Sequence, residues 1–420
     1  MADISPFCGL RYNLKTIKNI KDVFAPPYDI ISEKEQKELY ARHPFNVVRL
    51  ILAKTTKKDD EKSNRYSRAG SLFKKWIKDG VLVNDEKPAI YIYTQDYTVE
   101  GVRKKRIGFL ARMKFDEKGC LPHEHTLIKP KEDRLRLIRR VHANLSPIFS
   151  FYIDNKNAVG NILKSYLKKK PLISFTDAEK IRHCFWKVDE AAAIKKICGL
   201  MKNKQVFIAD GHHRYEVSRN FRDELLSAGY PPDGDFNHVM MYLTGFNEDN
   251  LYVMPTHRLV KNVPELESKL EALKKYFSVT AVKSLSAMLT SQKKEKGFSL
   301  GMYYKGKFFV LTMQDARLLE KLMRKTPQQW RKLDVAMLNT VVFEHIFKLD
   351  EAQKEDNIGY TRDAQEAVYS VNKKHFDVAF FPNATKAEQV KTIALSGSRM
   401  PQKSTYFYPK PITGLVIHKF

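Results

Sequence analysis

Cysteine is scarce in this sequence. Its 420 residues include four cysteines, Cys8, Cys120, Cys184 and Cys198, and they form neither a CxxC pair nor a Cys/His ligand cluster. Such spacing argues against a zinc module and is typical of a reducing compartment. Long hydrophobic runs are also missing, since no window approaches the roughly 18 apolar residues that a membrane span requires. The N-terminus lacks a basic segment followed by an apolar one. We therefore expect a soluble cytoplasmic protein with no membrane partner.

Acidic residues are outnumbered, because 74 Lys and Arg face 48 Asp and Glu and give a formal net charge of +26. Such a surplus favours nucleic-acid binding, since Lys and Arg gain affinity by neutralising phosphates. The basic residues nevertheless occur in short scattered groups such as Lys104–Arg106 and Lys168–Lys170. No helix-turn-helix, zinc-finger or RNP pattern accompanies them. The charge therefore predicts a solvated surface and a phosphate-rich small ligand, with nucleic acid as the alternative.

The length and the 43% hydrophobic content are typical of two or three globular domains. Apolar runs typical of strands alternate with segments of helical spacing, which predicts a mixed α/β (α+β) fold. The expected units are an N-terminal α/β unit at 1–150, a central unit at 151–263 and a C-terminal α/β unit at 264–420. Expected strands are 47–52, 89–94, 106–113, 148–153, 205–209, 239–244, a hairpin at 300–312, 376–381 and 414–418, and expected helices are 66–78, 132–141, 158–169, 190–201, about a dozen residues from 215, 266–277 and 386–395.

The most specific pattern is VFIADGHHRYEVS at residues 206–218, where an apolar strand ends in Asp210 and Gly211. His212, His213 and Arg214 follow at the expected first turn of a helix. Free N–H groups and the helix dipole favour an anion there, and glycine allows close approach. The arginine can grip a phosphate bidentately, and the imidazoles can donate hydrogen bonds or protons. The aspartate can bind Mg²⁺ or orient one of the imidazoles. The pattern predicts a phosphate site, although a helix cap with two surface histidines is the alternative. It is not a Walker loop, because GxxxxGK[ST] is absent.

A second pattern is LPHEHTLIKPKEDRLRLIRR at residues 121–140, in which Glu124 lies between His123 and His125. A carboxylate in this setting can act as a general base. The alternative is a solvated loop before a charged helix start. A zinc site is not expected, because HExH differs from the HExxH motif and histidines two apart do not share a helix face.

A third pattern is FAPPYDII at residues 24–31. Its two prolines fix an extended entry into a helix with capping-box chemistry. A rigid turn is one interpretation. The functional interpretation makes Asp29 a second carboxylate that faces the anion site.

A fourth pattern is SGSRMPQKSTYFYPK at residues 396–410, which places Lys403, Ser404 and Thr405 before three consecutive aromatic residues. Such a segment can hold a nucleotide by stacking and by phosphate contacts. The alternative is an ordinary loop that leads into the final strand.

The sequence contains five characteristic segments, which are APPYD, HEHT with KPKEDRLRL, ANLSPIF, ADGHHRYE and MPQKSTYFYPKPITGL. Together they closely resemble a widespread prokaryotic family that is described as a domain of unknown function. The resemblance runs from residue 25 to residue 415. Separately, the DGHHR box resembles the phosphate-gripping motif of the ParB and sulfiredoxin superfamily. Within that superfamily it is most similar to the box of free-serine kinases, which transfer a phosphoryl group from ADP or ATP to the hydroxyl of L-serine.

This resemblance implies a ParB/sulfiredoxin-like core in the central unit, with the residues of the DGHHR box around the donor phosphates. Glu124 or Asp29 would act as the base, with His213 as a further catalytic group, and Asp210 would hold Mg²⁺. Lys403, Ser404 and Thr405 would add nucleotide contacts. We therefore expect an Mg²⁺-dependent kinase that uses ATP or ADP, with L-serine as the favoured acceptor. A nucleotide-switched DNA-binding protein of the ParB type and a regulatory nucleotide-binding protein without turnover stay open as alternatives.

Overall fold

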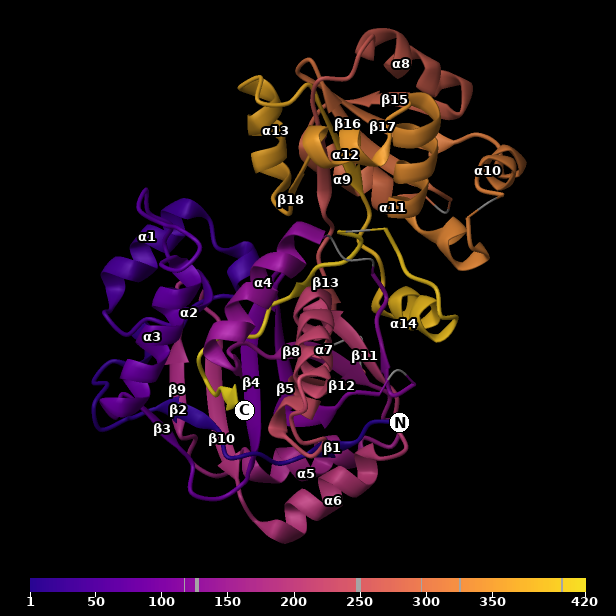
Figure 1. The fold of residues 1–420 in the computed structure, drawn as a ribbon. Helices are drawn as coiled ribbons and strands as arrows, with labels where there is room; N and C mark the ends of the chain where they lie inside the picture. The colour runs from indigo at the N-terminus through magenta and orange to yellow at the C-terminus, as the bar shows by residue number, and fades with distance from the viewer. Residues whose placement is uncertain (117, 125–127, 247–250, 296, 325, 402) are drawn as a thin grey trace. The chain divides into compact units, whose positions relative to one another are not determined.

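The computed structural model describes residues 1–116, 118–124, 128–246, 251–295, 297–324, 326–401 and 403–420. The chain divides into two compact units, and its ribbon is drawn in Figure 1. Unit 1 comprises Met1–Pro122, Thr126–Leu251 and Pro409–Phe420, and unit 2 comprises His123–His125 and Tyr252–Tyr408. Each unit combines helices with a large sheet, so the predicted mixed α/β class is confirmed. In the described part of the chain, no helix is both long enough and apolar enough to cross a membrane.

Within the described residues, unit 1 contains a sheet of nine strands in the order β6-β11-β8-β12-β5-β4-β10-β9, with β1 paired to β5. The strands are β1 (Ile4–Ser5), β4 (Ile90–Val99), β5 (Val102–Lys114), β6 (Cys120–Leu121), β8 (Ile148–Tyr152), β9 (Ile173–Thr176), β10 (Arg182–Val188), β11 (Val206–Asp210) and β12 (His238–Gly245). β8 is buried along its whole length. This explains why four of its five residues are apolar, with Ser150 as the exception, and why the strand does not alternate between apolar and polar residues.

Helices and shorter strands complete unit 1. The helices are α1 (Glu33–Arg42), α2 (Val48–Ile51), α3 (Arg65–Lys78), α4 (Ile128–Val141), α5 (Ala158–Tyr166), α6 (Ala191–Met201) and α7 (His212–Ser227), with 3-10 turns η1 (Ile20–Val23), η2 (Tyr28–Ile30) and η3 (Asp235–Asn237). β2 (Leu10–Tyr12) pairs with β3 (Leu82–Asn84), and β7 (Ala143–Asn144) pairs with β21 (His418–Lys419). α5 and α6 contribute to the main apolar core, and α4 packs on α7 through a smaller cluster that includes Ile138, Val217 and Phe221.

One predicted strand is wrong, because residues 47–52 form the short helix α2 instead. A buried apolar run of this length fits either a strand or a helix, so the pattern alone does not decide. The local decision comes from Asn46. Its side-chain oxygen accepts from the backbone N–H of Val48 at 2.9 Å, and its amide donates to the backbone carbonyls of Asp22 and Phe24. These bonds start a helix where a strand was expected.

Unit 2 contains a second sheet, of six strands within the described residues, in the order β15-β17-β16-β19-β14-β18. Its strands are β14 (His257–Val260), β15 (Phe277–Val282), β16 (Ser299–Tyr304), β17 (Lys307–Met313), β18 (Ile358–Thr361) and β19 (Val378–Pro382), and β13 (Tyr252–Val253) pairs separately with β20 (Phe407–Tyr408). The helices are α8 (Leu266–Ala272), η4 (Leu273–Lys275), α9 (Leu285–Lys294), α10 (Ala316–Leu322), η5 (Gln328–Lys332), α11 (Asp334–Met337), the π-helix η6 (Leu338–Ile346), α12 (Glu351–Asn357), α13 (Ala364–Asn372) and α14 (Ala387–Leu395).

The units differ from the three-part division expected from the sequence. Strands from residues 1–150 and from residues 151–251 share one sheet, because β12 pairs with β5 and β10 pairs with β4. Residues 252–263 belong to unit 2. β8 itself runs across residue 150. At the other end, Pro409–Phe420 belongs to unit 1 although the preceding residues belong to unit 2. The expected closing strand at 414–418 is shorter in the structure, where β21 begins at His418.

Candidate phosphate-binding site

The DGHHR box forms a tight strand-to-helix turn in unit 1. β11 ends at Asp210, Gly211 adopts a φ of +97°, and α7 begins at His212. Glycine is needed here, because residues with a Cβ atom rarely adopt this left-handed backbone. Gly211 has no side chain that could accept from the N–H groups of the first turn. The N-terminus of α7 therefore presents backbone donors and a positive dipole at the end of β11.

Arg214 folds back over this turn. A Cβ atom added to Gly211 would lie 3.0 Å from the guanidinium carbon of Arg214. The guanidinium donates to Asp210 Oδ2 and to the backbone carbonyl of Pro147, each at 2.5 Å. Its side chain is 13% exposed. Both bonds fix the direction of the guanidinium, which places a cation at the N-terminus of α7.

Lys410 joins the two predicted carboxylates of unit 1. Its Nζ atom lies 2.5 Å from Asp29 Oδ2 and 2.6 Å from Asp210 Oδ1. Lys410 is 8% exposed, whereas the side chains of Asp29 and Asp210 are 28% and 19% exposed. Asp29, Lys410, Asp210 and Arg214 thus form a row of alternating charges, named here the charge row. The structure brings Asp29 into the same row as Asp210 through this shared lysine.

The two histidines of the box start α7. His212 is buried and His213 is half-buried. Both belong to the first turn of the helix, where the sequence pattern places them. The structure therefore brings Asp210, Gly211, His212, His213 and Arg214 together in one turn.

The sequence predicts that Asp210 holds Mg²⁺, and in the structure the carboxylate of Asp210 is paired with two cationic side chains. One oxygen of Asp210 faces Lys410 and the other faces Arg214. In the part of the chain that the structure describes, no group of three or more His, Cys, Asp or Glu side chains could hold a metal ion. Lys410 lies between Asp29 and Asp210, where a bridging cation would otherwise neutralise two carboxylates. A Mg²⁺ ion carried by nucleotide phosphates is not affected by this geometry.

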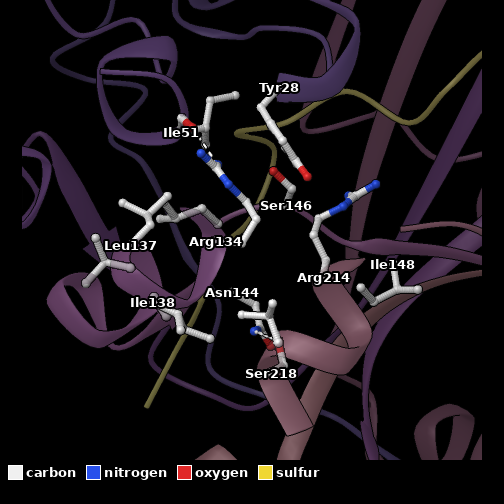
Figure 2. A pocket seen from close by; sticks show the side chains of 14 residues that line it. Tyr28, Ile51, Arg134, Leu137, Ile138, Asn144, Ser146, Ile148, Arg214 and Ser218 are labelled. Carbon is white, nitrogen blue, oxygen red and sulfur yellow. Dashed lines mark hydrogen bonds between the residues drawn. The ribbon is translucent and has the colours of Figure 1, made fainter. Parts of the chain in front are cut away.

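A small cavity of about 60 Å³ opens beside Arg214. Figure 2 shows Tyr28 and Ser146 on the same side of the cavity as Arg214, and Leu137 and Ile138 on the other side. Burial raises the pKa of the Tyr28 phenol, so this group keeps its proton and its capacity to donate. The cavity therefore combines an apolar wall with hydroxyl groups next to the cation.

Arg134 forms a further part of the cavity wall. Its guanidinium lies 4.0 Å from the centre of the Tyr28 ring. It also donates to the backbone carbonyl of Ile51 at 2.7 Å and to Asp133 at 2.6 Å. These bonds fix Arg134 in the cavity wall, and its guanidinium packs against the Tyr28 ring. Arg134 therefore stabilises the position of Tyr28 beside the cavity.

A sequence profile described as "Protein of unknown function (DUF1015)" matches residues 4–336. The chain belongs to the DUF1015 family. No curated protein sequence matches this DUF1015 chain. Among solved structures, a free serine kinase in complex with AMP is similar at 15% identity and a TM-score of 0.34, over 70% of this chain and 86% of the other.

Two further solved structures show likenesses of the same order. SbnI with a C-terminal truncation from Staphylococcus aureus has 12% identity and a TM-score of 0.38, over 74% of this chain and 87% of the other. A conserved hypothetical protein from Pyrococcus furiosus has 14% identity and a TM-score of 0.36, over 73% of this chain and 94% of the other.

Four predicted site residues of the DUF1015 chain lie in unit 2. Glu124 Oε1 accepts from the backbone N–H of Lys403 at 2.9 Å, and Lys403 has a φ of +56°. Thr405 Oγ1 lies 3.0 Å from His123 Nε2. The structure thus brings Glu124 together with residues 403–405, as one turn inside unit 2. His125 and Thr126 of the HEHT box lie outside the described residues.

Ser404 is held inside this turn. It is 4% exposed, and its hydroxyl donates to the backbone carbonyl of Pro401 at 2.5 Å. Its own carbonyl accepts from Thr385 Oγ1 at 3.0 Å. The neighbouring carbonyl of Lys403 accepts from the buried Arg258 at 2.9 Å, and burial lowers the pKa of Arg258 to about 10. The polar groups of the turn therefore serve largely to fold it.

Lys410 is one of the basic residues of the fourth sequence pattern, but it is not among the predicted site residues. The residue lies between two prolines, Pro409 and Pro411, and 381 positions from Asp29 in the sequence. Two prolines around a lysine restrict the backbone, which is the signal that was available. Its partners depend on the tertiary fold and no local pattern indicates them.

Proposed function

We propose that this DUF1015 chain binds the phosphates of ATP or ADP at the first turn of α7 and transfers a phosphoryl group to the hydroxyl of a small molecule, with L-serine as the favoured acceptor. The observation that carries the proposal is the Arg214 guanidinium, fixed by Asp210 and Pro147 above Gly211 at the N-terminus of α7. A helix N-terminus with a fixed guanidinium is suited to a phosphate group.

Phosphoryl transfer requires positioning and charge stabilisation more than covalent chemistry by the protein. Arg214 has five N–H groups, and its two bonds to Asp210 and Pro147 use two of them. The others and the backbone donors of α7 would bind the transferred phosphate. Lys410 adds a second cation in the charge row, and His213 would donate to a phosphate oxygen. Mg²⁺ would enter with the nucleotide phosphates and neutralise part of their charge.

The acceptor hydroxyl requires a base, and two carboxylates are candidates. Asp29 belongs to the charge row, where its Oδ2 atom lies 2.5 Å from Lys410 Nζ. Glu124 is oriented by the backbone N–H of Lys403. Loss of turnover without loss of nucleotide affinity, in Asp29→Asn or in Glu124→Gln, would identify the base between them.

The test is phosphorus NMR of the products formed with Mg²⁺, ATP or ADP and a panel of hydroxylated metabolites that includes L-serine. We expect O-phosphoserine, with a rate lowered by about 10² to 10³ in Arg214→Ala, as for the removal of one charge-stabilising donor. Arg139→Ala is the matched control, because Arg139 forms a half-exposed pair with Glu224 and leaves α7 intact. A folded Arg214→Ala variant with unchanged ADP affinity and turnover would overturn the phosphate assignment. ADP binding without any product would leave a nucleotide-binding protein without turnover.

A further inference from the structure

Residues 409–413, named here the C-terminal segment, carry the lysine of the charge row back into unit 1. A lysine side chain has four rotatable bonds, so its ammonium has no fixed place unless its backbone and its partners are fixed. Lys410 nevertheless meets Asp29 and Asp210 at once. The residues that hold its backbone therefore decide where the ammonium lies.

Two fully buried polar side chains of the sheet hold that backbone. Gln95 on β4 and Arg106 on β5 are direct cross-strand partners, and both are 0% exposed. The Arg106 guanidinium donates to the Gln95 side-chain oxygen and to the backbone carbonyl of Pro409. The Gln95 amide donates to the backbone carbonyl of Lys410 at 3.1 Å. Two successive carbonyls of the C-terminal segment are thus bound by this pair.

The same guanidinium also packs against the strand that accompanies Asp210. Arg106 lies 4.4 Å from the centre of the Phe149 ring. Phe149 on β8 is the register partner of Asp210 on β11. Arg106 therefore contacts both the segment that carries Lys410 and the neighbour of the carboxylate that Lys410 meets. A buried guanidinium is costly to desolvate, so a position inside a sheet requires compensating contacts of this kind.

The far end of the C-terminal segment is fixed as well. Thr413 Oγ1 lies 2.9 Å from Ser146 Oγ, and the backbone of Thr413 exchanges hydrogen bonds with Ala25 at 2.9 and 3.3 Å. Lys410 thus projects from a short segment that is bound at both ends.

We infer that Arg106 and Gln95 are positioning residues for Lys410. They fix the backbone of the C-terminal segment, and this fixes the ammonium between Asp29 and Asp210. Without this support the two carboxylates would lose their shared cation and Asp210 would no longer hold Arg214 in one direction. The consequence for catalysis rests on the proposed function, whereas the positioning of Lys410 does not.

The reactivity of the Lys410 amine toward acetic anhydride reports whether the ammonium stays buried between Asp29 and Asp210. Trace acetylation with acetic anhydride, followed by peptide mass spectrometry, is applied to the full chain and to Arg106→Met. We expect the reactivity of Lys410 to rise about tenfold in the variant, as after the loss of one or two buried hydrogen bonds. Lys204 is the internal control, because it forms an ion pair with Asp154 at 3.2 Å in the same unit. Unchanged Lys410 reactivity, or an equal rise at Lys204, would overturn the inference.

A second variant covers the case in which Arg106→Met does not fold. Gln95→Met keeps the size of the side chain and removes the bond to the Lys410 carbonyl. We expect a smaller rise of Lys410 reactivity, of about threefold, with Lys204 unchanged. The absence of any rise in a folded Gln95→Met variant would contradict the role of the pair.

The kinetic constants then distinguish a specific effect on Lys410 from a general destabilisation of unit 1. In Arg106→Met we expect the kcat of phosphoryl transfer to fall about tenfold, with the KM for nucleotide changed less than twofold. Arg106→Lys, which keeps a donor toward Pro409, should restore part of the rate. A raised KM with unchanged kcat would contradict the inference. If the wild-type chain transfers no phosphoryl group, the proposed function fails, and the acetylation result still decides whether Arg106 and Gln95 position Lys410.

Discussion

The two groups of predicted site residues are held in different ways. In unit 1, Asp29, Asp210 and Arg214 are joined through side-chain ion pairs that include Lys410. In unit 2, Glu124 and residues 403–405 are held largely by backbone hydrogen bonds. The proposed phosphate site belongs to the first group, whose cations Lys410 and Arg214 are paired with carboxylates. The second group is a folded turn, and Glu124 is its carboxylate. We therefore assign the proposed charge handling to unit 1.

The largest expected effect on stability is a difference in the free energy of unfolding between variants of Lys410 in unit 1 and of Lys403 in unit 2. Lys410→Met removes a buried ammonium that is shared by two partly exposed carboxylates, so we expect the free energy of unfolding to fall by about 2 kcal/mol. Lys403 has an exposed side chain in its turn, and Lys403→Met should change the same quantity by about 0.5 kcal/mol or less. Urea denaturation of both variants measures the difference. Equal changes in the two variants would remove the distinction between the groups.

The next effect concerns ADP affinity and the turn from Asp210 to Arg214. In Gly211→Ala the left-handed backbone is strained and the new Cβ meets the Arg214 guanidinium at 3.0 Å. We expect ADP affinity to fall about hundredfold by calorimetry, since each tenfold loss corresponds to about 1.4 kcal/mol.

Gly229→Ala is the matched control for this turn. Gly229 follows the other end of α7 with a φ of +83°, and nothing lies within 4 Å of a Cβ added there. This variant has comparable backbone strain without the contact to Arg214. ADP affinity should stay unchanged in it, and an equal loss in both variants would show that the loss does not come from the contact with Arg214.

The sequence predicted those elements whose signals are local. The apolar strand β11 with its polar end, and the hairpin of β16 and β17 around Lys305 and Gly306, are confirmed. Lys305 and Gly306 both have positive φ values, which is the reason a hairpin forms there. Residues 47–52 could not be assigned correctly, because the hydrogen bonds of Asn46 to Asp22 and Phe24 decide their conformation.

The same distinction between local signals and distant contacts applies to the candidate site. The turn from Asp210 to Arg214 follows from its own residues. The support by Lys410 and Arg106 does not, because Lys410 meets Asp29 across 381 positions and Arg106 meets Pro409 across 303. Such contacts depend on which strands become neighbours, and the local patterns of one sequence carry no signal for that.

Acid should lower the free energy of unfolding through both units, since each unit contains a buried histidine whose pKa is lowered. Burial lowers the pKa of His418 in unit 1 to about 3 and that of His257 in unit 2 to about 4. The unfolded value is about 6.5, so the unfolded chain binds more protons as the pH falls. This contribution to stability is complete above about pH 6.5 and is lost toward pH 4, at about 1.4 kcal/mol per pH unit for each histidine.

The measurement is the urea midpoint at pH 7 and at pH 5 for wild type, His418→Gln and His257→Gln. Each variant should lose less stability between the two pH values than wild type does. If neither variant reduces the acid-dependent drop, other groups dominate the acid response, and the common behaviour of the two units is contradicted.

The smallest expected effect tests whether the turn of unit 2 contacts nucleotide at all. Ser404→Ala removes a buried hydroxyl that donates to the backbone carbonyl of Pro401, so the free energy of unfolding should fall by about 1 kcal/mol. ADP affinity should stay within twofold of wild type, because the hydroxyl is engaged inside the turn. A tenfold loss of affinity with unchanged stability would instead show that Ser404 leaves Pro401 to bind a phosphate. Unit 2 would then share the charge handling that the comparison assigns to unit 1, and the nucleotide role that the sequence pattern predicts for residues 403–405 would be confirmed.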